Sequence, residues 1–302
     1  MQQRILVIGA INVDLVERVE RFPQRGETVA ALSSHRSPGG KAANQAAAAA
    51  HHLPDPGQVM LVGAVGDDQH GLEQVELLDK AGVDTRLIRR VMGTATGSAV
   101  VIVDEHGENR IIVNAGANRF VSAGNLYGAP AVAVVVAQTE VSTAAVSAAA
   151  HHARTYGARF IVNNGPVATL DSEVLVQCDP LVVNEGEARA MLGDQASGRE
   201  HLAKRLVRGT ECVSAVVTLG RDGCVWAARD NNGSIPGRFV ADVVDTTGAG
   251  DFFVGTLAAE LSRGSDLPAA ADTATAAAAQ SVRWTGTRVP EHIGASGSLM
   301  PD

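Results

Sequence analysis

Short hydrophobic runs recur along the chain, and each is followed by glycine, asparagine or glutamate. Six of them have the length of a buried strand: "RILVIG" (4–9), "QVMLVGAVG" (58–66), "AVAVVVAQTE" (131–140), "RFIVNNGP" (159–166), "PLVVNEGE" (180–187) and "VSAVVTLG" (213–220). A stretch able to form a helix comes after each run. Strands that alternate with helices in this way predict a mostly parallel central sheet covered on both faces, a three-layer α/β/α fold.

Two regions interrupt this alternation. "INVDLVERVERFPQRGETVAALSSHRS" (11–37) alternates polar and apolar residues and carries a turn at Pro23–Gly26. "TATGSAVVIVDEHGENRIIVNAGAN" (94–118) has the pattern of a hairpin that turns at Glu105–Glu108. Four short strands of this kind do not fit a parallel layer. We therefore expect a single domain over residues 1–302, in which residues 11–37 and 93–116 form a small β-sheet that projects over the strand ends as a lid.

The composition argues against several classes of protein. Hydrophobic residues make up 45% of the chain, enough for a large core, while the formal net charge is −8 and dense runs of Lys and Arg are absent. This charge argues against nucleic-acid binding. No stretch approaches the roughly 18 apolar residues that span a bilayer, and the first residues lack the pattern of a signal peptide. Cys178, Cys212 and Cys224 fit no C-x-x-C pattern, so we expect reduced thiols in a cytoplasmic protein without membrane contact.

The segment "DTTGAGDFF" (245–253) carries the strongest chemical signal. It joins a strand-like stretch, "RFVADVV" (238–244), to a helix-like one, "DFFVGTLAAELSR" (251–263). Gly248 and Gly250 allow a sharp turn and a close approach to a ligand. The amides of Ala249, Gly250 and Asp251 would then be free donors at a helix N-terminus, where phosphate is attracted. Asp251 would be placed to accept a proton from an attacking hydroxyl, although an ordinary helix cap would explain the loop alone equally well.

Three common nucleotide-binding and metal-binding motifs are missing from the sequence. It has no G-x-x-x-x-G-K-[ST] motif, no G-x-G-x-x-G motif after the first strand and no H-E-x-x-H motif. "DTTGAGDFF" and "SPGGKAANQAAAAA" (37–50) instead resemble the C-terminal and N-terminal signatures of the ribokinase-like, or phosphofructokinase-B, sugar kinases. The resemblance runs from "VIGAINVD" to "TGTRVP", nearly the whole chain. It implies that a hydroxymethyl group is phosphorylated from ATP with magnesium.

The resemblance also implies roles for individual residues around the acceptor. Asp251 matches the catalytic base, and the backbone of Gly248, Ala249 and Gly250 matches the anion hole. The positions that match sugar contacts are Asn12, Asp14, Gly39, Gly40, Lys41, Asn44 and Glu140. Carboxylate and amide side chains of this kind can both accept and donate the hydrogen bonds that sugar hydroxyls need. Taken singly, each motif is also compatible with a strand edge, a helix entry or a solvated lysine.

On the nucleotide side, the resemblance assigns Asn184 and Glu187 to an element that orients magnesium and phosphates through water. The nucleotide-binding positions it implies are Thr218, Gly220, Gly223, Gly250 and Thr275. A monovalent cation, potassium, is implied beside the anion hole, at Asp245, Thr247, Ser281, Trp284 and Gly286. Three departures from the family pattern stand out: "GTRVP" is shorter than expected, Thr275 is smaller than the usual residue, and Ala42 replaces a usual glycine.

Within the family the motifs look most like those of ribokinase. This implies that D-ribose is phosphorylated at O5 to ribose 5-phosphate, by a homodimer that forms through the lid. A sibling kinase for fructose, deoxyribose, a ketodeoxy sugar acid or a nucleoside such as adenosine remains an alternative, as does a catalytically silent sugar-binding protein. A nucleoside base would need aromatic partners, and the lid offers chiefly Phe22. An acidic sugar would need an arginine, for which Arg110 and Arg119 are candidates.

Overall fold

Two β-sheets organise the part of the chain that the structure, a computed structural model, describes: residues 3–193 and 198–289. The strands of the larger sheet are β1 Ile5–Ile8, β4 Val59–Gly66, β5 Val83–Asp84, β6 Ile88–Val91, β9 Val134–Gln138, β10 Arg159–Asn163, β11 Cys178–Asn184, β12 Ser214–Thr218, β13 Gly223–Ala228 and β14 Asn232–Pro236. The strands of the smaller sheet are β2 Asn12–Arg18, β3 Ser33–Gly39, β7 Gly97–Val103 and β8 Asn109–Asn114. The α-helices are α1 Lys41–His52, α2 Gln69–Lys80, α3 Thr143–Tyr156, α4 Ser172–Leu175, α5 Glu185–Leu192, α6 Leu202–Thr210, α7 Ala249–Ser262 and α8 Leu267–Ser281.

The larger sheet is mostly parallel, as predicted. Its strands follow the order β14-β13-β12-β11-β10-β9-β1-β4-β5, and β6 also pairs with β4. Along the sheet from β12 to β5, each strand is parallel to its neighbours, and so is the β4–β6 pair. The pairs β12–β13 and β13–β14 are antiparallel. The six hydrophobic runs form β1, β4, β9, β10, β11 and β12, which confirms their assignment as strands.

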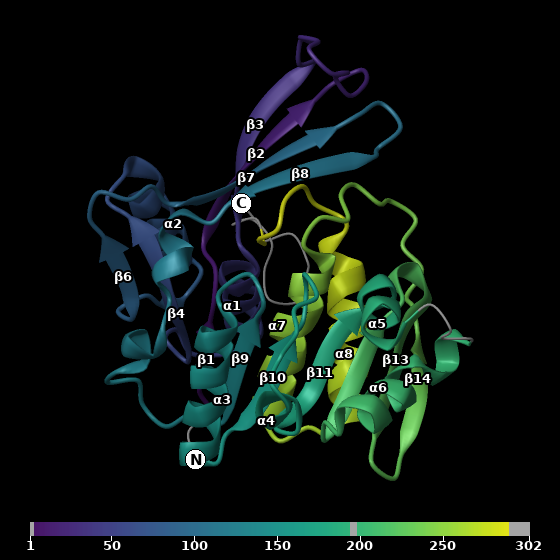
Figure 1. The fold of residues 1–302 in the computed structure, drawn as a ribbon. Coiled ribbons are helices and arrows are strands. Elements are labelled where there is room, and N and C mark those ends of the chain that lie inside the picture. The colour runs from purple at the N-terminus through teal and green to yellow at the C-terminus, as the bar shows by residue number, and fades with distance from the viewer. Residues whose placement is uncertain (1–2, 194–197, 290–302) are drawn as a thin grey trace.

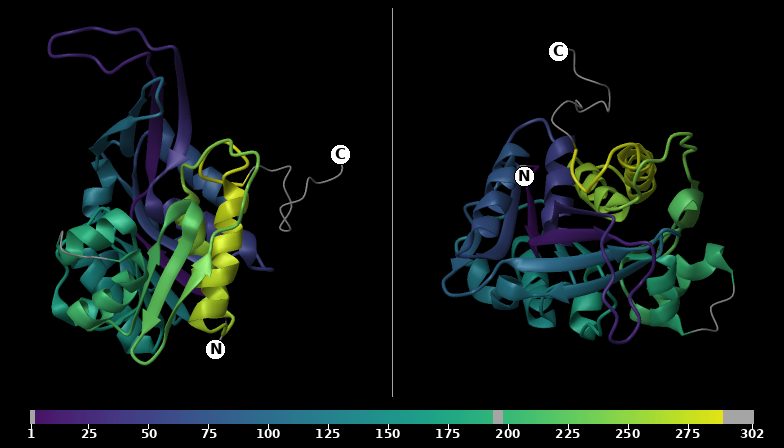
Figure 2. Two further views of the ribbon diagram at one scale, coloured as in Figure 1. Left: turned by 90° about the vertical axis from the view of Figure 1, so that its right-hand side faces the viewer. Right: turned by 90° about the horizontal axis from the view of Figure 1, so that it is seen from above.

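Helices cover both faces of this sheet, which confirms the three-layer α/β/α architecture (Figures 1 and 2). The alternation of side chains along β1 shows how the two faces are filled. Ile5 and Val7 belong to a core with α1, α7 and α8, while Leu6 and Ile8 belong to a core with α3, α5 and α6. Every residue of β1 is buried, as expected for a strand with helices above and below.

The smaller sheet has the order β3-β2-β7-β8 and projects beyond one end of the larger sheet (Figure 1). β2 pairs antiparallel with β3 and parallel with β7, and β7 and β8 form a hairpin. The connection between β7 and β8 contains Glu105–Glu108, where the turn was predicted. The role of this sheet as a lid on a single domain stays a prediction.

Two local expectations were wrong. The run that forms β12 is followed by the antiparallel strands β13 and β14 and not by a helix. The stretch 238–244, predicted as a strand, is not one: Phe239, Val243 and Val244 are largely exposed, and the Val244 amide donates to the carbonyl of Val282. This segment leaves the sheet edge at β14 and crosses to the end of α8, so it has no neighbouring strand to pair with.

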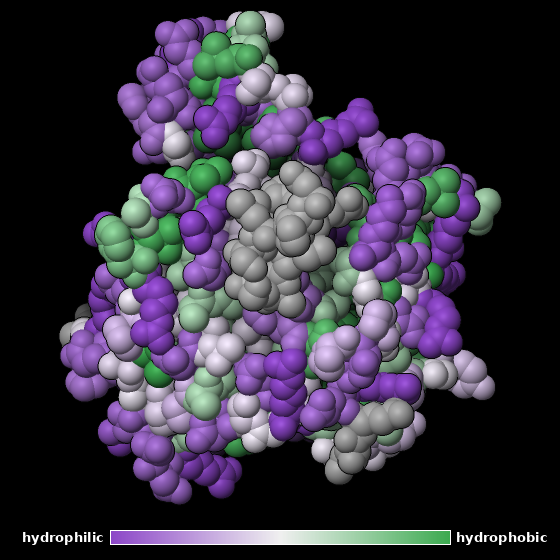
Figure 3. Space-filling model, turned by 180° about the vertical axis from the view of Figure 1, so that it is seen from behind, coloured by the Kyte–Doolittle hydropathy of each residue, from purple (hydrophilic) through white to green (hydrophobic). Residues whose placement is uncertain are grey.

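The cysteines and the surface have the properties that the composition predicts. Cys178, Cys212 and Cys224 are buried and free of disulfides, as expected. Burial raises the pKa of Cys224 to about 11, so this thiol stays protonated near neutral pH. Among the described residues, no helix is both long and apolar enough to span a membrane. Figure 3 shows a mainly hydrophilic surface with scattered hydrophobic patches, some of them on the projecting smaller sheet.

Candidate active site

The N-terminus of α7 holds the predicted catalytic residues. Gly248 caps the helix with φ of 78°, and a side chain there would lie 2.9 Å from Cβ of Thr287. The Ala249 amide donates to the carbonyl of Thr246, but the amides of Gly250 and Asp251 have no acceptor among the described residues. Open space lies in front of Gly250. Two free amides at a helix start are therefore available to an anion such as a phosphoryl group.

Asp251 lies in the first turn of α7 and is only 6% exposed. Its Oδ2 accepts a hydrogen bond from Nδ2 of Asn44 at 3.0 Å, and its Oδ1 accepts one from Nε2 of Gln45 at 3.0 Å. Nζ of Lys41 lies 3.8 Å from Oδ1. All three partners come from the start of α1, which the sequence places about 200 positions earlier. The carboxylate is thus fixed by its neighbours and remains close to the free amides.

Close packing of α1 against α7 makes these contacts possible. Gly255 faces the backbone of α1: a side chain there would come within 2.5 Å of the carbonyl of Gln45 and 2.6 Å of Cβ of Ala48. The alanine tract of α1 presents an equally small surface. The two helices therefore approach closely enough for the short side chain of Asn44 to reach Asp251.

Asn12 and Asp14, two of the predicted sugar contacts, lie at the start of β2. Oδ1 of Asn12 accepts a hydrogen bond of 2.7 Å from Nδ2 of Asn118, which holds the amide group in place. The carboxylate of Asp14 lies against Gly39, where a side chain would come within 2.2 Å of Oδ1. Burial and the charge of Asp251 together raise the pKa of Asp14 to about 6. Asp14 and Asp251 thus face the same space and repel each other.

Lys41 connects Glu140 to Asp251. Oε2 of Glu140 accepts a hydrogen bond of 2.8 Å from the backbone amide of Lys41, the first residue of α1. Burial raises the pKa of Glu140, although the amide and charge of Lys41 oppose this shift. The charge of Asp251, and less strongly those of Glu140 and Glu187, raises the pKa of Lys41. The ammonium group therefore stays charged among three carboxylates.

Asn184 and Glu187 form a reciprocal cap at the start of α5. Oδ1 of Asn184 accepts from the Glu187 amide at 2.8 Å, and Oε2 of Glu187 accepts from the Asn184 amide at 2.7 Å. Oε1 of Glu187 lies over Gly165 and has no hydrogen-bond donor among the described residues. One carboxylate oxygen is therefore free to bind water around a magnesium ion. This fits Mg²⁺, which keeps several waters in nucleotide sites.

The remaining predicted nucleotide contacts, Thr218, Gly220, Gly223 and Thr275, differ in how much free space surrounds them. Thr218 ends β12, and Gly220 follows in the next turn with φ of 60° and free space around it. A side chain at Gly223 would collide with the carbonyl of Ile235. Thr275 is buried in α8, where its hydroxyl donates to the carbonyl of Ala271 at 2.8 Å. Thr275 therefore uses its hydroxyl inside its own helix.

Comparison with known proteins identifies the family. Residues 2–293 match the family described as "pfkB family carbohydrate kinase". The chain belongs to this family of carbohydrate kinases. It is 31% identical to the ribokinase of Schizosaccharomyces pombe over 98% of this chain and 97% of that one, and 32% identical to the deoxyribokinase of Salmonella typhi over 94% of both. A structure of Arabidopsis thaliana ribokinase complexed with ribose and ATP matches 99% of this chain and 96% of that one, with a TM-score of 0.85 and 28% identity.

Membership of the pfkB family makes this protein a phosphotransferase that uses an alcohol group as acceptor. The predicted resemblance to these kinases and the predicted enzyme class are thereby confirmed. The two sequence signatures lie next to each other in the structure. The N-terminal signature contains Lys41 and Asn44, and the C-terminal one contains the free amides and Asp251. Which alcohol is phosphorylated is a separate question.

Asp245 joins both halves of the monovalent-cation site that the pfkB resemblance implies. Its Oδ1 accepts from the Thr247 amide and its Oδ2 from the Gly286 amide, each at 2.9 Å. Burial acts to raise the pKa of Asp245, but these hydrogen bonds outweigh burial and lower it, so the carboxylate is charged. Ser281 and Trp284 are buried in the chain just before Gly286. A charged carboxylate is a donor that would fit a monovalent cation, and the carbonyl ligands stay those that the resemblance implies.

Several residues of this site were missed by sequence analysis. Gln45 bridges Asp251 to Asn163 and accepts a hydrogen bond of 2.6 Å from Gln138. The hydroxyl of Thr287 lies 3.0 Å from Oδ1 of Asn44 and 2.9 Å from the carbonyl of Pro38. The only available signal for Gln45 was its place beside Asn44 in the N-terminal signature. Thr287 and the following Arg288 lie in the shortened "GTRVP" segment, whose path the sequence does not reveal.

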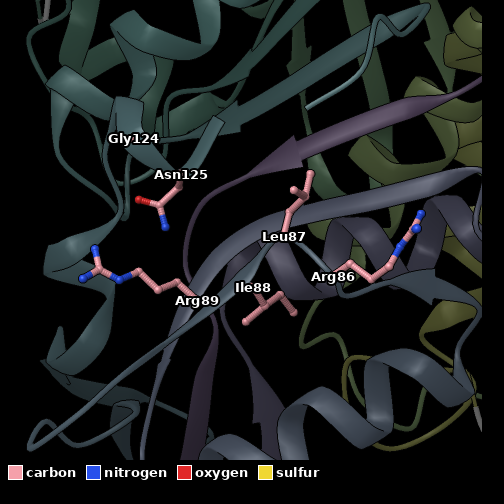
Figure 4. A pocket seen from close by; sticks show the side chains of 6 residues that line it. All are labelled: Arg86, Leu87, Ile88, Arg89, Gly124 and Asn125. Atoms are coloured by element: carbon pink, nitrogen blue, oxygen red, sulfur yellow. The ribbon is translucent and has the colours of Figure 1, made fainter. Parts of the chain in front are cut away.

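A separate pocket lies outside these predicted positions. Figure 4 shows its lining, which consists of Arg86, Leu87, Ile88, Arg89, Gly124 and Asn125. Arg86 and Arg89 extend to opposite sides, and Arg86 is paired with Asp84. The charged groups of this pocket do not converge on one point, as a binding site for a charged ligand would require.

Proposed function

We propose that this kinase transfers the γ-phosphoryl group of ATP to O5 of D-ribose, forming ribose 5-phosphate and ADP. One arrangement carries the proposal. Asp251 lies beside two free amides, its own and that of Gly250, and it interacts with the side chains of Asn44 and Asp14. The curated relatives named ribokinase support ribose as acceptor.

In this proposal each group has a defined task. Asp251 accepts the proton of the acceptor hydroxyl as its oxygen attacks phosphorus. The amides at the start of α7 hydrogen-bond the phosphoryl oxygens, whose charge is greatest in the transition state. Lys41 adds a positive charge 3.8 Å from the base, where it can attract the phosphoryl oxygens as they approach.

A magnesium ion would accompany the phosphates of ATP. Glu187, held by its cap with Asn184, would bind the hydration shell of the ion through its free oxygen. When bound, Mg²⁺ neutralises phosphate charge and orients the transferring group. Asp245 would hold potassium beside the anion hole, together with carbonyls near Thr247, Ser281, Trp284 and Gly286.

The contacts of the lid favour a sugar over the alternative acceptors. The guanidinium of Arg110 lies 4.2 Å from the ring centroid of Phe22, so one face of this ring is already covered and cannot stack on a nucleoside base. Nε of Arg119 donates to the carbonyl of Gly116, which leaves it poorly placed to bind a sugar acid. Asp251 and its free amides are intact, which argues against a silent sugar-binding protein. Deoxyribose remains the second candidate because a curated deoxyribokinase is an equally similar relative.

The acceptor is identified by an ADP-release assay with D-ribose, 2-deoxy-D-ribose, D-fructose and adenosine at equal concentration. We expect the highest kcat/KM for D-ribose, and a phosphorus NMR spectrum of a phosphomonoester coupled to the C5 protons. A higher kcat/KM for 2-deoxy-D-ribose would instead identify a deoxyribokinase. Phosphorylation of adenosine alone would contradict the sugar assignment.

We also propose that the protein is a homodimer that forms through the smaller sheet. β8 exposes three consecutive hydrophobic residues, Ile111, Ile112 and Val113, which are 54–65% exposed. A second copy would cover this strand. Light scattering at micromolar concentration should give the mass of two chains, and Ile112→Lys should give the mass of one. A wild-type monomer would contradict this proposal. The cytoplasmic location stays a prediction.

A further inference from the structure

The segment after α8 brings an arginine to the acceptor side of the site. The hydroxyl of Thr287 lies against the carbonyl of Pro38 and the side chain of Asn44. Pro38 pairs with Val13 on β2, directly beside Asp14. Arg288 follows and extends to α2, where its Nη2 donates a hydrogen bond of 3.1 Å to Oε1 of Gln74. Arg288 therefore lies close enough to Asp14 for the two charges to interact.

Two nitrogens of this guanidinium have no hydrogen-bond partner within residues 3–193 and 198–289. Nε and Nη1 of Arg288 are buried and have no hydrogen-bond partner among the described residues. Arg288 also forms no ion pair within 4.0 Å in this part of the chain, although the charge of Asp14 acts on it. Buried donors without acceptors cost free energy, and a buried charge costs more. Their persistence beside the predicted sugar contacts is explained if a ligand supplies the missing acceptor.

The charges at this corner define the chemistry of that acceptor. Burial lowers the pKa of Arg288 to about 10, so it remains protonated near neutral pH. The opposing carboxylate of Asp14 balances this positive charge. An anionic substituent would be attracted by one group and repelled by the other. A hydroxyl suits both groups, since its oxygen accepts from the guanidinium while its proton is donated to the carboxylate.

We propose that Arg288 is a specificity-determining residue that, with Asp14, recognises one ring hydroxyl of a neutral sugar acceptor. The proposal rests on the proposed sugar-kinase function and adds to it: the shortened segment after Gly286 supplies part of the acceptor pocket. Gln74 has a positioning role, because it holds the guanidinium at Nη2 and leaves the other donors to the sugar.

The test compares Arg288→Gln with a matched control, Arg283→Gln, in the full-length protein. Arg283 lies five positions earlier, is exposed, and interacts with Gln280 at the end of α8. The substrates are ATP with D-ribose, 2-deoxy-D-ribose, 3-deoxy-D-ribose or D-ribonate. Arg288→Gln should raise KM for D-ribose by about 10- to 100-fold, as expected for a lost charge-assisted hydrogen bond. KM for ATP should stay unchanged, and Arg283→Gln should behave as wild type.

The deoxy sugars separate recognition from a structural role. One of them lacks the hydroxyl that Arg288 binds, so its KM should change little in Arg288→Gln, and the preference for D-ribose over that sugar should fall. Gln74→Leu, which only frees the guanidinium, should raise KM for D-ribose in the same direction by a smaller factor. It also provides the test if Arg288→Gln does not fold, and an unchanged KM for D-ribose in Gln74→Leu would then overturn the proposal.

Three other results would overturn it. Arg288→Gln could keep the wild-type KM for D-ribose, or could raise KM for ATP and for all sugars alike, as a structural residue would. Wild type could also prefer D-ribonate to D-ribose, which would make Arg288 a carboxylate-binding residue. If wild type phosphorylates D-ribose and Arg288→Gln leaves KM for D-ribose unchanged, the proposed function stands and this inference fails. If wild type phosphorylates no pentose, both fail.

Discussion

Nδ2 of Asn44 donates a hydrogen bond of 3.0 Å to Oδ2 of Asp251, although 207 positions separate the two residues. The contact connects the start of α1 with the start of α7, and so connects the two sequence signatures. It also fixes one carboxylate oxygen while the helix amides beside it stay free. The geometry of this pair therefore determines how well Asp251 can act as a base.

Replacing Asn44 by aspartate tests this pairing. Asn44→Asp removes the hydrogen-bond donor of Asp251 and places a second carboxylate beside it, which repels both Asp251 and the incoming phosphoryl group. The base is then displaced from its place beside the free amides, so kcat should fall by about 10²-fold. The turnover number is measured by ADP release. Asn232→Asp, an exposed change of the same kind on β14, should keep the wild-type kcat; an unchanged kcat in Asn44→Asp would contradict the role we assign to this pair.

Asp14 should make the protein less stable at neutral pH than it would be with an amide in its place. Its pKa is raised from 3.8 to about 6, so between these values the folded protein keeps a proton that the unfolded chain has released. The free energy of unfolding contributed by this group therefore falls as pH rises through this window, and the cost is complete above it.

Asp14→Asn removes that cost. Its unfolding temperature, measured by calorimetry, should exceed that of wild type at pH 8, and the difference should shrink towards pH 4. The same variant should bind D-ribose more weakly, because an amide has one accepting oxygen where the carboxylate has two and carries no negative charge. Equal unfolding temperatures at pH 8 would show that Asp14 is better solvated than its burial indicates.

Gly248 should tolerate no side chain. Its φ of 78° disfavours other residues, and an added Cβ would meet Thr287 at 2.9 Å. Gly248→Ala should shift the amides of the anion hole and lower kcat by about 10²–10³, the loss typical of one oxyanion donor. Gly157→Ala is the matched control, because Gly157 has φ of 66° with free space around it and should lose stability only. Full turnover in Gly248→Ala would contradict the anion hole.

Much of the fold follows from patterns that are local in the sequence. The runs that form β1, β4, β9, β10, β11 and β12 are hydrophobic on both faces, as buried parallel strands must be. The stretch 238–244 has a similar composition and is not a strand, because strand formation also requires a neighbour. β13 and β14 were missed, since "GCVWAA" follows "TLGRDG" with no marked alternation.

The site was predictable only where residues belong to a motif. Asp251, Lys41 and Asn44 lie in the two signatures, and the structure brings them together. Gln45, Thr287 and Arg288 matter through contacts with residues about 200 positions away or more, or with a different helix, and no local pattern encodes these contacts. The capping pair Asn184 and Glu187 shows the intermediate case, in which one local motif fits both a helix cap and a metal site.

Potassium should activate the enzyme through Asp245. The carboxylate is ionised because its pKa is lowered, so it supplies the negative charge for a monovalent cation. Turnover should be higher in potassium chloride than in choline chloride at equal ionic strength, and Asp245→Asn should lose most of this difference. Asp242→Asn, an exposed change three positions earlier, should keep it. Equal turnover in both salts would show that the shortened segment after Gly286 has removed the site.

The central claim is that Asp251 removes the proton from the acceptor hydroxyl. The most direct measurement is the turnover number of Asp251→Asn with D-ribose and ATP, together with calorimetric binding of both ligands. The account predicts that both ligands still bind while turnover falls by about 10²–10⁴, the usual contribution of a positioned general base. Turnover equal to that of wild type, with the carboxylate absent, would contradict it.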